Sequence, residues 1–132
     1  MSTIEARLSP WAPQMLSILR IMSGLLFMEH GTMKAFGFPA PMHNFTWLSL
    51  LGATAVIEGI GGLLVTLGLF TRIAAFIMSG EMAFAFFMEH FPKSFFPALN
   101  GGDAAVLYCF VFLYFVFSGP GPWSIDAARR KG

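Results

Sequence analysis

The sequence predicts an all-α, polytopic membrane protein whose four helices form an antiparallel transmembrane bundle. Apolar residues make up 56% of the 132 residues and charged residues only 11%, less than half of the roughly 25% found in a typical soluble domain. Mean hydropathy is +0.69. The apolar residues gather in four long stretches, and a bilayer core of about 30 Å needs about 20 apolar residues per helix. A single membrane domain, residues 1–132, is therefore expected.

The four helices are expected at about residues 15–36, 47–70, 73–91 and 103–118. Pro10 and Pro13 should prevent the first helix from extending backwards. The turn at Thr71-Arg72 is so short that the second and third helices must be antiparallel neighbours. Asp103 is expected to cap the N-terminus of the fourth helix. That helix is short, and Phe-rich flanks or local bilayer thinning would let it span.

An even number of spans places both termini and the Thr71-Arg72 turn on one side of the membrane. That side carries most of the basic residues outside the helices, namely Arg7, Arg72, Arg129, Arg130 and Lys131. The opposite side has only Lys34 and Lys93. The positive-inside rule therefore predicts cytoplasmic termini in a bacterial-type inner (plasma) membrane.

Ionisable and polar residues within or at the ends of the apolar stretches mark a candidate site, because such groups are costly in hydrocarbon and usually face the bundle interior. The candidates for cofactor binding or proton relay are Arg20, Glu29, His30, Lys34, Glu58, Glu81, Asn100 and Asp103. A rise of 1.5 Å per residue places Glu29 and His30 roughly 10 Å, and Glu58 and Glu81 roughly 15 Å, below the surface opposite the termini.

Several interpretations of these groups remain open. In the first, Arg20 or Lys34 pairs with an acid and fixes helix register. In the second, the polar groups lie at the bottom of a pocket that is lined by Phe and Met and suits a quinone. A proton relay through Glu58, Glu81 and His30 is a third interpretation. A metal site is disfavoured, because the chain lacks the Glu-x-x-His pairs of di-iron bundles and has one cysteine. The net charge of +1, without a basic stripe, argues against nucleic acid as a partner.

Several motifs, in order and spacing, resemble the DoxX family of small membrane proteins over about residues 16–126. They are Arg20-x3-Gly24-x2-Phe27-x2-His30-Gly31-x2-Lys34, Glu58-x2-Gly61-Gly62, Gly68-Leu69-x-Thr71-Arg72-x-Ala74-Ala75, Asn100-Gly101-Gly102-Asp103 and Gly119-Pro120-Gly121-x-Trp123-Ser124-x-Asp126. The positions that match the family pattern are Arg20, His30, Lys34, Glu58, Arg72, Asn100 and Asp103. Asp103 departs mildly from it, since the family often has Glu there.

The resemblance implies four membrane helices and a link to redox chemistry, because relatives include the DoxD-type subunit of a thiosulfate:quinone oxidoreductase and members associated with oxidative-stress and thiol systems. The first hypothesis is a membrane subunit that binds a quinone or another lipophilic molecule and supports an oxidoreductase, without a redox centre of its own. The alternative is a non-catalytic scaffold or assembly partner, whose buried charges only fix helix packing. A small transporter is a third hypothesis and would need a homo-oligomer. The expected partners are the lipid bilayer and a membrane or redox protein.

Overall fold

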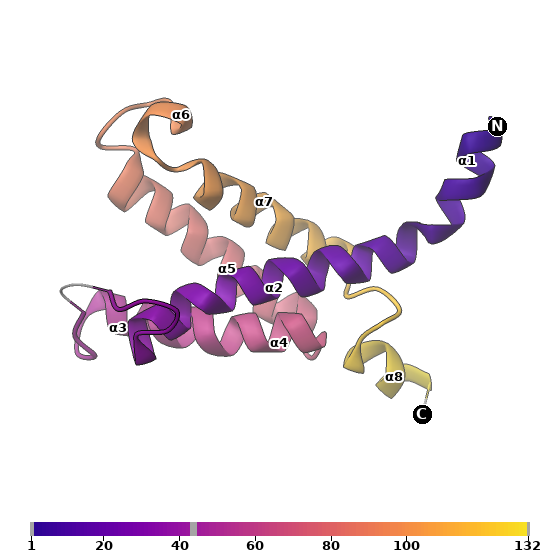
Figure 1. The fold of residues 1–132 in the computed structure, drawn as a ribbon, viewed down its shortest axis with the longest axis horizontal. Helices are drawn as coiled ribbons and strands as arrows, with labels where there is room; N and C mark the ends of the chain where they lie inside the picture. The colour runs from indigo at the N-terminus through magenta and orange to yellow at the C-terminus, as the bar shows by residue number, and fades with distance from the viewer. Residues whose placement is uncertain (1, 43–44, 132) are drawn as a thin grey trace.

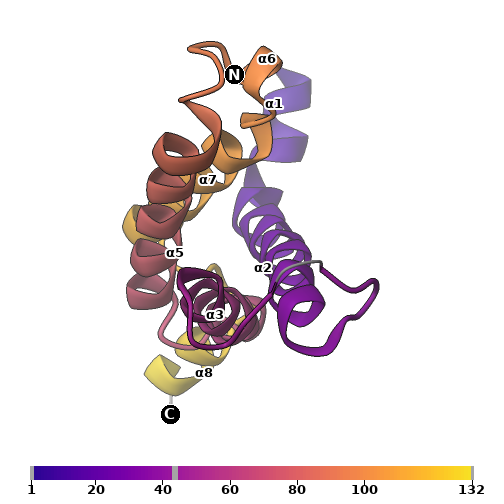
Figure 2. The ribbon, with the colours of Figure 1, turned by 90° about the vertical axis from the view of Figure 1, so that its left-hand side faces the viewer.

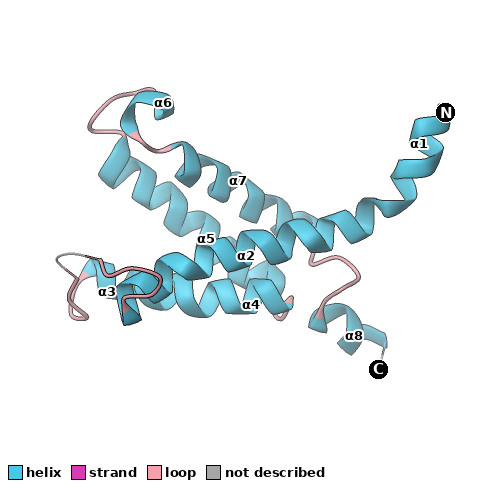
Figure 3. Cartoon of the chain, in the orientation of Figure 1, coloured by secondary structure: helices cyan, strands magenta, loops and turns pink. Residues whose placement is uncertain are grey.

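The structure is a computed structural model that describes residues 2–42 and 45–131, and the described chain is helical without strands (Figure 3). Its helical elements, in chain order, are α1 (Thr3–Leu8), η1 (Ser9–Trp11), α2 (Ala12–Phe36), α3 (Leu50–Val56), η2 (Ile57–Gly61), α4 (Gly62–Leu67), α5 (Thr71–Ala85), η3 (Phe86–His90), α6 (Pro97–Asn100), α7 (Asp103–Ser118) and α8 (Ile125–Lys131). The turns η2 and η3 are π-helical.

Two helical hairpins make up the molecule, one formed by α2 with α3–η2–α4 and the other by α5–η3 with α7 (Figure 1). The hairpins converge near α8 and splay apart towards α3 and α6 (Figures 1 and 2). We call the first the α8 end, which comprises residues 68–71 and 119–131, and the second the open end, which comprises residues 37–42, 45–49 and 91–102. Sequential helices run antiparallel as predicted, but they form a wedge instead of a uniformly closed four-helix bundle.

Glycines let the two helices of the first hairpin approach closely. A Cβ added at Gly24 would lie 2.5 Å from Thr66 Oγ1, and one at Gly31 would lie 2.4 Å from the backbone nitrogen of Gly59. Gly62 meets α2 in the same way, with Met28 Cα 2.9 Å from the position of its missing Cβ. Small residues at membrane-helix contacts allow the backbones to gain van der Waals contact, so these glycines serve helix packing.

The second hairpin supplies most of the apolar core. Its buried side chains pack with Phe27 of α2 and Val65 of α4, and they are Ala74, Ala75, Met78, Met82, Ala105, Phe112 and Phe115. The ring of Phe27 lies 5.0 Å from that of Phe112 and 5.4 Å from that of Tyr108, centroid to centroid. These rings form the contact through which α2 meets α7.

Arg20 joins the two hairpins at the α8 end. Its guanidinium group is 1% exposed and donates hydrogen bonds to the carbonyl oxygens of Val65 at 2.9 Å and Trp123 at 2.7 Å, and also to that of Pro120. Among the described residues no carboxylate lies within ion-pair distance of Arg20. Of the two basic residues considered for pairing with an acid, Lys34 forms the pair, with Glu58, whereas backbone carbonyls provide the acceptors of Arg20.

Helix α8 docks through Asp126. Its carboxylate accepts hydrogen bonds from the backbone N–H groups of Phe70 and Thr71, both at 2.9 Å, at the start of α5. The Asp126 N–H in turn donates to Gly68 O at 2.9 Å. Partial burial raises the pKa of Asp126, but these N–H groups outweigh it, and the net result is a pKa below the usual value.

Predicted and observed helix bounds agree closely for the fourth helix, which is α7, and within a few residues for the others. The expectation at Pro10 was wrong, since helical turns continue backwards through η1 to Thr3; each proline stands in the first turn of its element, where its missing N–H is tolerated. Asp103 is the first residue of α7 and makes no capping hydrogen bond, and Gly102 occupies the N-cap. The turn before α5 lies at residues 68–70, and Thr71 is already helical.

In the part of the chain that the structure describes, three helical segments are long and apolar enough to cross a membrane, namely Thr3–Phe36, Leu50–Leu67 and Thr71–His90. The segment Asp103–Ser118 is apolar but shorter. Large apolar side chains such as Phe76, Phe110 and Phe117, each more than 60% exposed, cover the outward faces of the second hairpin. Such faces fit a surrounding of lipid.

Gly31→Ala is expected to loosen the first hairpin, because the new methyl group would collide with the backbone of η2. Overpacking of this kind costs about 1–3 kcal/mol, so the apparent Tm in detergent should fall. Gly80→Ala is the matched control, since nothing lies within 4 Å of a Cβ at Gly80. An equal fall in Tm for both variants would contradict the close packing at Gly31.

Asp126→Asn is expected to lower stability by about 0.3–1 kcal/mol, the usual value of a negative charge at a helix N-terminus. Because the folded-state pKa of Asp126 lies below its unfolded value, its contribution is present at neutral pH and is lost as pH falls through the folded value, below about pH 4. Thermal unfolding followed from pH 7 to pH 3 should therefore separate wild type from variant at neutral pH and bring them together in acid. Asp103→Asn, at an exposed residue without a cap bond, should leave the profile unchanged.

Candidate functional site: a polar-floored cavity between the hairpins

A cavity of about 470 Å³ lies in the open half of the wedge, between the two hairpins. Its lining comes from α2, α3, η2, α5, η3 and α7, so it exists only because the hairpins separate. The polar lining residues are His30, Lys34, Thr54, Glu58, Glu81, Glu89, His90 and Tyr108. The apolar lining includes Phe27, Met42, Leu50, Leu51, Met82, Phe84 and Met88. The site thus combines apolar walls with polar groups contributed by every hairpin segment around it.

Lys34 and Glu58 form an ion pair across the first hairpin. The Lys34 Nζ lies 2.8 Å from each oxygen of the Glu58 carboxylate and 2.9 Å from Thr54 Oγ1. The two charged side chains are 9% and 6% exposed. The Thr54 hydroxyl group in turn donates a hydrogen bond to the Leu51 carbonyl oxygen at 2.8 Å. An ammonium group has three protons, so the protein itself satisfies every donor of Lys34.

Glu81 presents the opposite case in the same cavity. This residue of α5 is 8% exposed, and neither carboxyl oxygen has a hydrogen-bond partner among residues 2–42 and 45–131. A buried polar group without a partner costs about 1–3 kcal/mol, and more if it is charged. Glu81 is therefore the group in the cavity best able to gain from a bound molecule.

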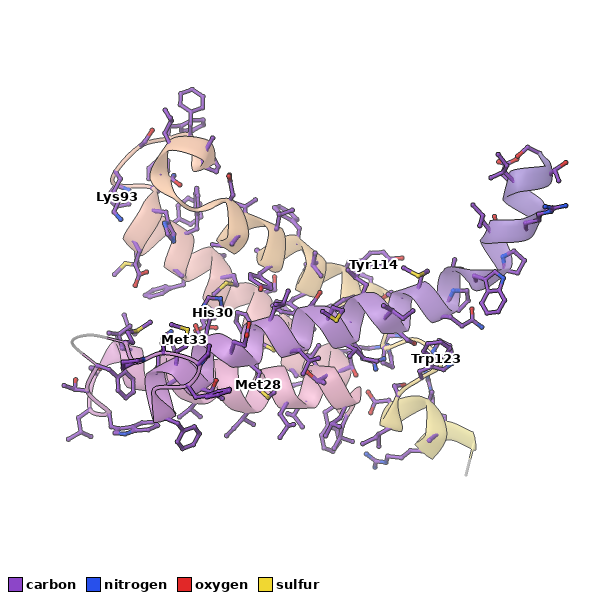
Figure 4. The ribbon with its side chains drawn as sticks, viewed as in Figure 1. Met28, His30, Met33, Lys93, Tyr114 and Trp123 are labelled. Carbon is purple, nitrogen blue, oxygen red and sulfur yellow. The ribbon has the colours of Figure 1, made fainter. Side chains whose placement is uncertain are left out.

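Aromatic and imidazole rings line the side of the cavity nearest α7. The Tyr108 ring stacks on Phe112 at 5.6 Å and lies 6.5 Å from the His30 ring. His30 projects from the side of α2 that faces the second hairpin (Figure 4). The arrangement offers a flat ligand both an aromatic wall and a nearby nitrogen that donates or accepts a hydrogen bond, according to its tautomer.

Both π-helical turns lie at the cavity. Glu58 belongs to η2, and the lining residues Met88, Glu89 and His90 belong to η3. A π-helical turn interrupts the regular spacing of side chains and often occurs at functional sites.

Of the eight candidate residues from the sequence, the structure brings four together in the cavity, namely His30, Lys34, Glu58 and Glu81. Glu29 and Asp103 are exposed and lie outside the lining. Arg20 belongs to the α8 end. Asn100 is the buried last residue of α6, and its side-chain amide donates to the Ser94 carbonyl oxygen and accepts from the Gly102 N–H, so it shapes the connection to α7. Across residues 2–42 and 45–131, no group of three His, Cys, Asp or Glu side chains is placed to hold a metal ion.

Sequence reasoning missed four polar residues of the lining. Thr54 carries no charge and Tyr108 lies in a uniformly apolar helix, so neither stood out. Glu89 and His90 lie at the end of the third apolar stretch, and η3 places them at the cavity, with His90 Nδ1 3.0 Å from the Asn100 carbonyl oxygen. The spacing of Tyr108 from Phe112 and Phe115, which are both buried, was a signal that could have identified the inward face of α7.

A helical fold with membrane-length apolar segments and an internal polar-floored cavity defines a multi-pass membrane protein. The family model for DoxX matches residues 15–91. The chain is also 45% identical, over 125 residues, to an uncharacterized protein of Haemophilus influenzae, a match that covers 90% of this chain and 93% of that protein. No solved structure gives a significant match. The chain therefore belongs to the DoxX family.

Removing one partner of the Lys34–Glu58 pair is expected to be costly, because the other charge would remain buried and unpaired. Lys34→Met should lower the free energy of unfolding by about 3–5 kcal/mol, whereas the double variant Lys34→Met/Glu58→Leu should recover much of that loss. Thermal unfolding of both variants in detergent tests this. Glu29→Gln, one turn away on the exposed face of α2, serves as control and should be close to wild type. A double variant as unstable as the single one would contradict the pairing energetics.

Proposed function

We propose that this DoxX protein binds a lipophilic small molecule of the quinone class in the cavity between its hairpins and so supports an oxidoreductase. The observation that carries the proposal is the unpartnered Glu81 carboxyl group in a cavity of about 470 Å³. Drug-sized and cofactor-sized ligands occupy clefts of about 300–1,000 Å³ with apolar walls and a few polar groups. The cavity matches that description.

The polar groups favour a ring with oxygen substituents over a purely apolar lipid. Glu81 accepts a hydrogen bond from a quinol hydroxyl group when it is ionised, and donates one to a quinone carbonyl when it is protonated. His30 and Tyr108 line the same cavity and offer further donors to a second ring oxygen. Phe27 and Met82 provide apolar contact for the ring and the start of its tail.

The charge distribution supports an orientation with the α8 end in the cytoplasm of a bacterial-type inner membrane. Arg72, Arg129 and Arg130 lie at that end. The basic residue of α2 nearest the open end is Lys34, and its charge is paired with Glu58. Positive charge near helix ends favours the cytoplasmic side. In this orientation the cavity opens in the outer half of the membrane.

The proposal is tested by native mass spectrometry and lipid extraction on protein purified in mild detergent, with a short-tailed benzoquinone added in a titration. Wild type should retain quinone stoichiometrically. Glu81→Gln keeps the shape of the side chain but changes its hydrogen-bonding capacity, and it should weaken quinone binding roughly tenfold, the value of a buried hydrogen bond to a charged group.

Glu29→Gln is the matched control, since it makes the same chemical change on the exposed face of α2 and should bind like wild type. A second variant, Ala104→Phe, adds a large side chain to the lining from an exposed position of α7 and should abolish retention while keeping Glu81. Retention of quinone by all three variants, or by none including wild type, would overturn the proposal.

One observation favours the rival function, a non-catalytic scaffold. The Lys34–Glu58 pair is fully satisfied within the protein, as expected of charges that only fix helix register. The same preparations distinguish the two functions, because a scaffold would co-purify with a defined membrane or redox protein, or with further copies of this chain, and would hold no small molecule.

A further inference from the structure

A second concavity, of about 510 Å³, lies at the α8 end, far from the cavity between the hairpins. It is formed by the turn before α5, the loop after α7 and α8, and its lining is Phe70, Thr71, Arg72, Ile73, Pro120, Asp126, Arg129 and Arg130. Three guanidinium groups thus meet in one hollow beside the end of a membrane helix.

The hollow carries a net positive charge, because its three arginines outnumber its one acid, Asp126. Both Asp126 oxygens accept backbone hydrogen bonds from Phe70 and Thr71. Arg72 directs one nitrogen, Nη1, to the carbonyl oxygens of Val116 and Phe117 at the end of α7, at 2.6 and 2.9 Å. Its position near Gly119 is possible because that residue has no Cβ, which would lie 3.0 Å from Nη2.

Arg129 and Arg130 keep their donors available. Within residues 2–42 and 45–131, neither guanidinium group forms an ion pair, and the Arg129 guanidinium lies over the Phe70 ring, 5.4 Å from its centroid, in a cation–π contact. The contact fixes the direction of one cation without using its N–H groups. Guanidinium groups present N–H donors in a fork that matches phosphate oxygens.

Apolar surface adjoins these cations. Phe70 is 53% and Ile73 67% exposed, and both line the hollow where α5 enters the apolar region. A free phosphate ion would gain nothing from these two side chains, whereas a phospholipid would lay an acyl chain along them while its phosphate lies between the arginines. Basic pockets between membrane helices are known to hold anionic headgroups.

From this geometry we infer a specific site for the phosphate headgroup of an anionic phospholipid at the α8 end, formed by Arg72, Arg129 and Arg130. One bound lipid would thus link α5, α7 and α8, because Arg72 of α5 contacts the end of α7 and the other two arginines belong to α8. It also holds α8 at the membrane surface, because two of the three cations belong to that helix. The site is separate from the cavity of Glu81 and does not depend on the proposed quinone function.

The test uses the full chain in mixed micelles that contain equal amounts of phosphatidylglycerol and phosphatidylcholine, with retained lipid measured by native mass spectrometry. Wild type should retain phosphatidylglycerol preferentially. Arg130→Gln and Arg129→Gln should each weaken that retention about five-fold, the value of one basic residue at an anionic surface. Arg7→Gln is the matched control, since it removes one positive charge from α1, outside the hollow, and should have no effect.

A second arm adds inorganic phosphate at increasing concentration. Retained lipid should resist it, because a free ion lacks the apolar contact. Displacement by millimolar phosphate would identify a free-anion site and overturn the assignment to lipid. Equal retention of the two lipids, or an equal loss in Arg7→Gln, would also overturn it, since either result indicates general surface charge.

Discussion

The helix termini at the α8 end carry partial charges, and the rest of the structure depends on how three side chains compensate for them. Arg20 binds carbonyl oxygens at the end of α4 and in the loop after α7. Arg72 binds the last carbonyls of α7, and Asp126 binds the first N–H groups of α5. Cations at helix C-termini and an anion at a helix N-terminus are the favourable arrangement for helix dipoles. A guanidinium group suits this role better than an ammonium group, because its planar fork reaches several acceptors at once.

This compensation at one end leaves the other end free to open. The glycines of α2 hold the first hairpin tightly together, and α5 and α7 pack closely through Ala75, Met78 and Phe115. Between the hairpins the main aromatic contact is the one made by Phe27, about midway along α2. Beyond that point the helices diverge, and the cavity occupies the space that results. The wedge is therefore a direct consequence of strong contacts within each hairpin and at the α8 end.

Much of this could be predicted from the sequence, since apolar length and helix-breaking residues are local signals. Residues 103–118 were placed correctly because Gly102 and Gly119 bound the helix on both sides. The inward direction of Glu58 and Glu81 follows from their cost in lipid. The partner of Arg20 could not be predicted, because its acceptors are backbone carbonyls from residues about 45 and 100 positions away. Thr54 and Tyr108 escaped notice because neither is unusual in an apolar helix until the neighbouring helices are placed.

The difference between Lys34 and Glu81 decides how the cavity is best understood. If the buried charges only fixed helix packing, Glu58 and Glu81 would both be expected to have protein partners, since a buried polar group without a partner lowers stability. Glu58 meets this expectation, with Lys34 bound to both of its oxygens. Glu81 does not, although it lies in the same cavity. Under the proposed function, the group that satisfies Glu81 is a molecule that enters the cavity from the membrane. The ion pair is thus the fixed part of the floor, and Glu81 is the part that a ligand would complete.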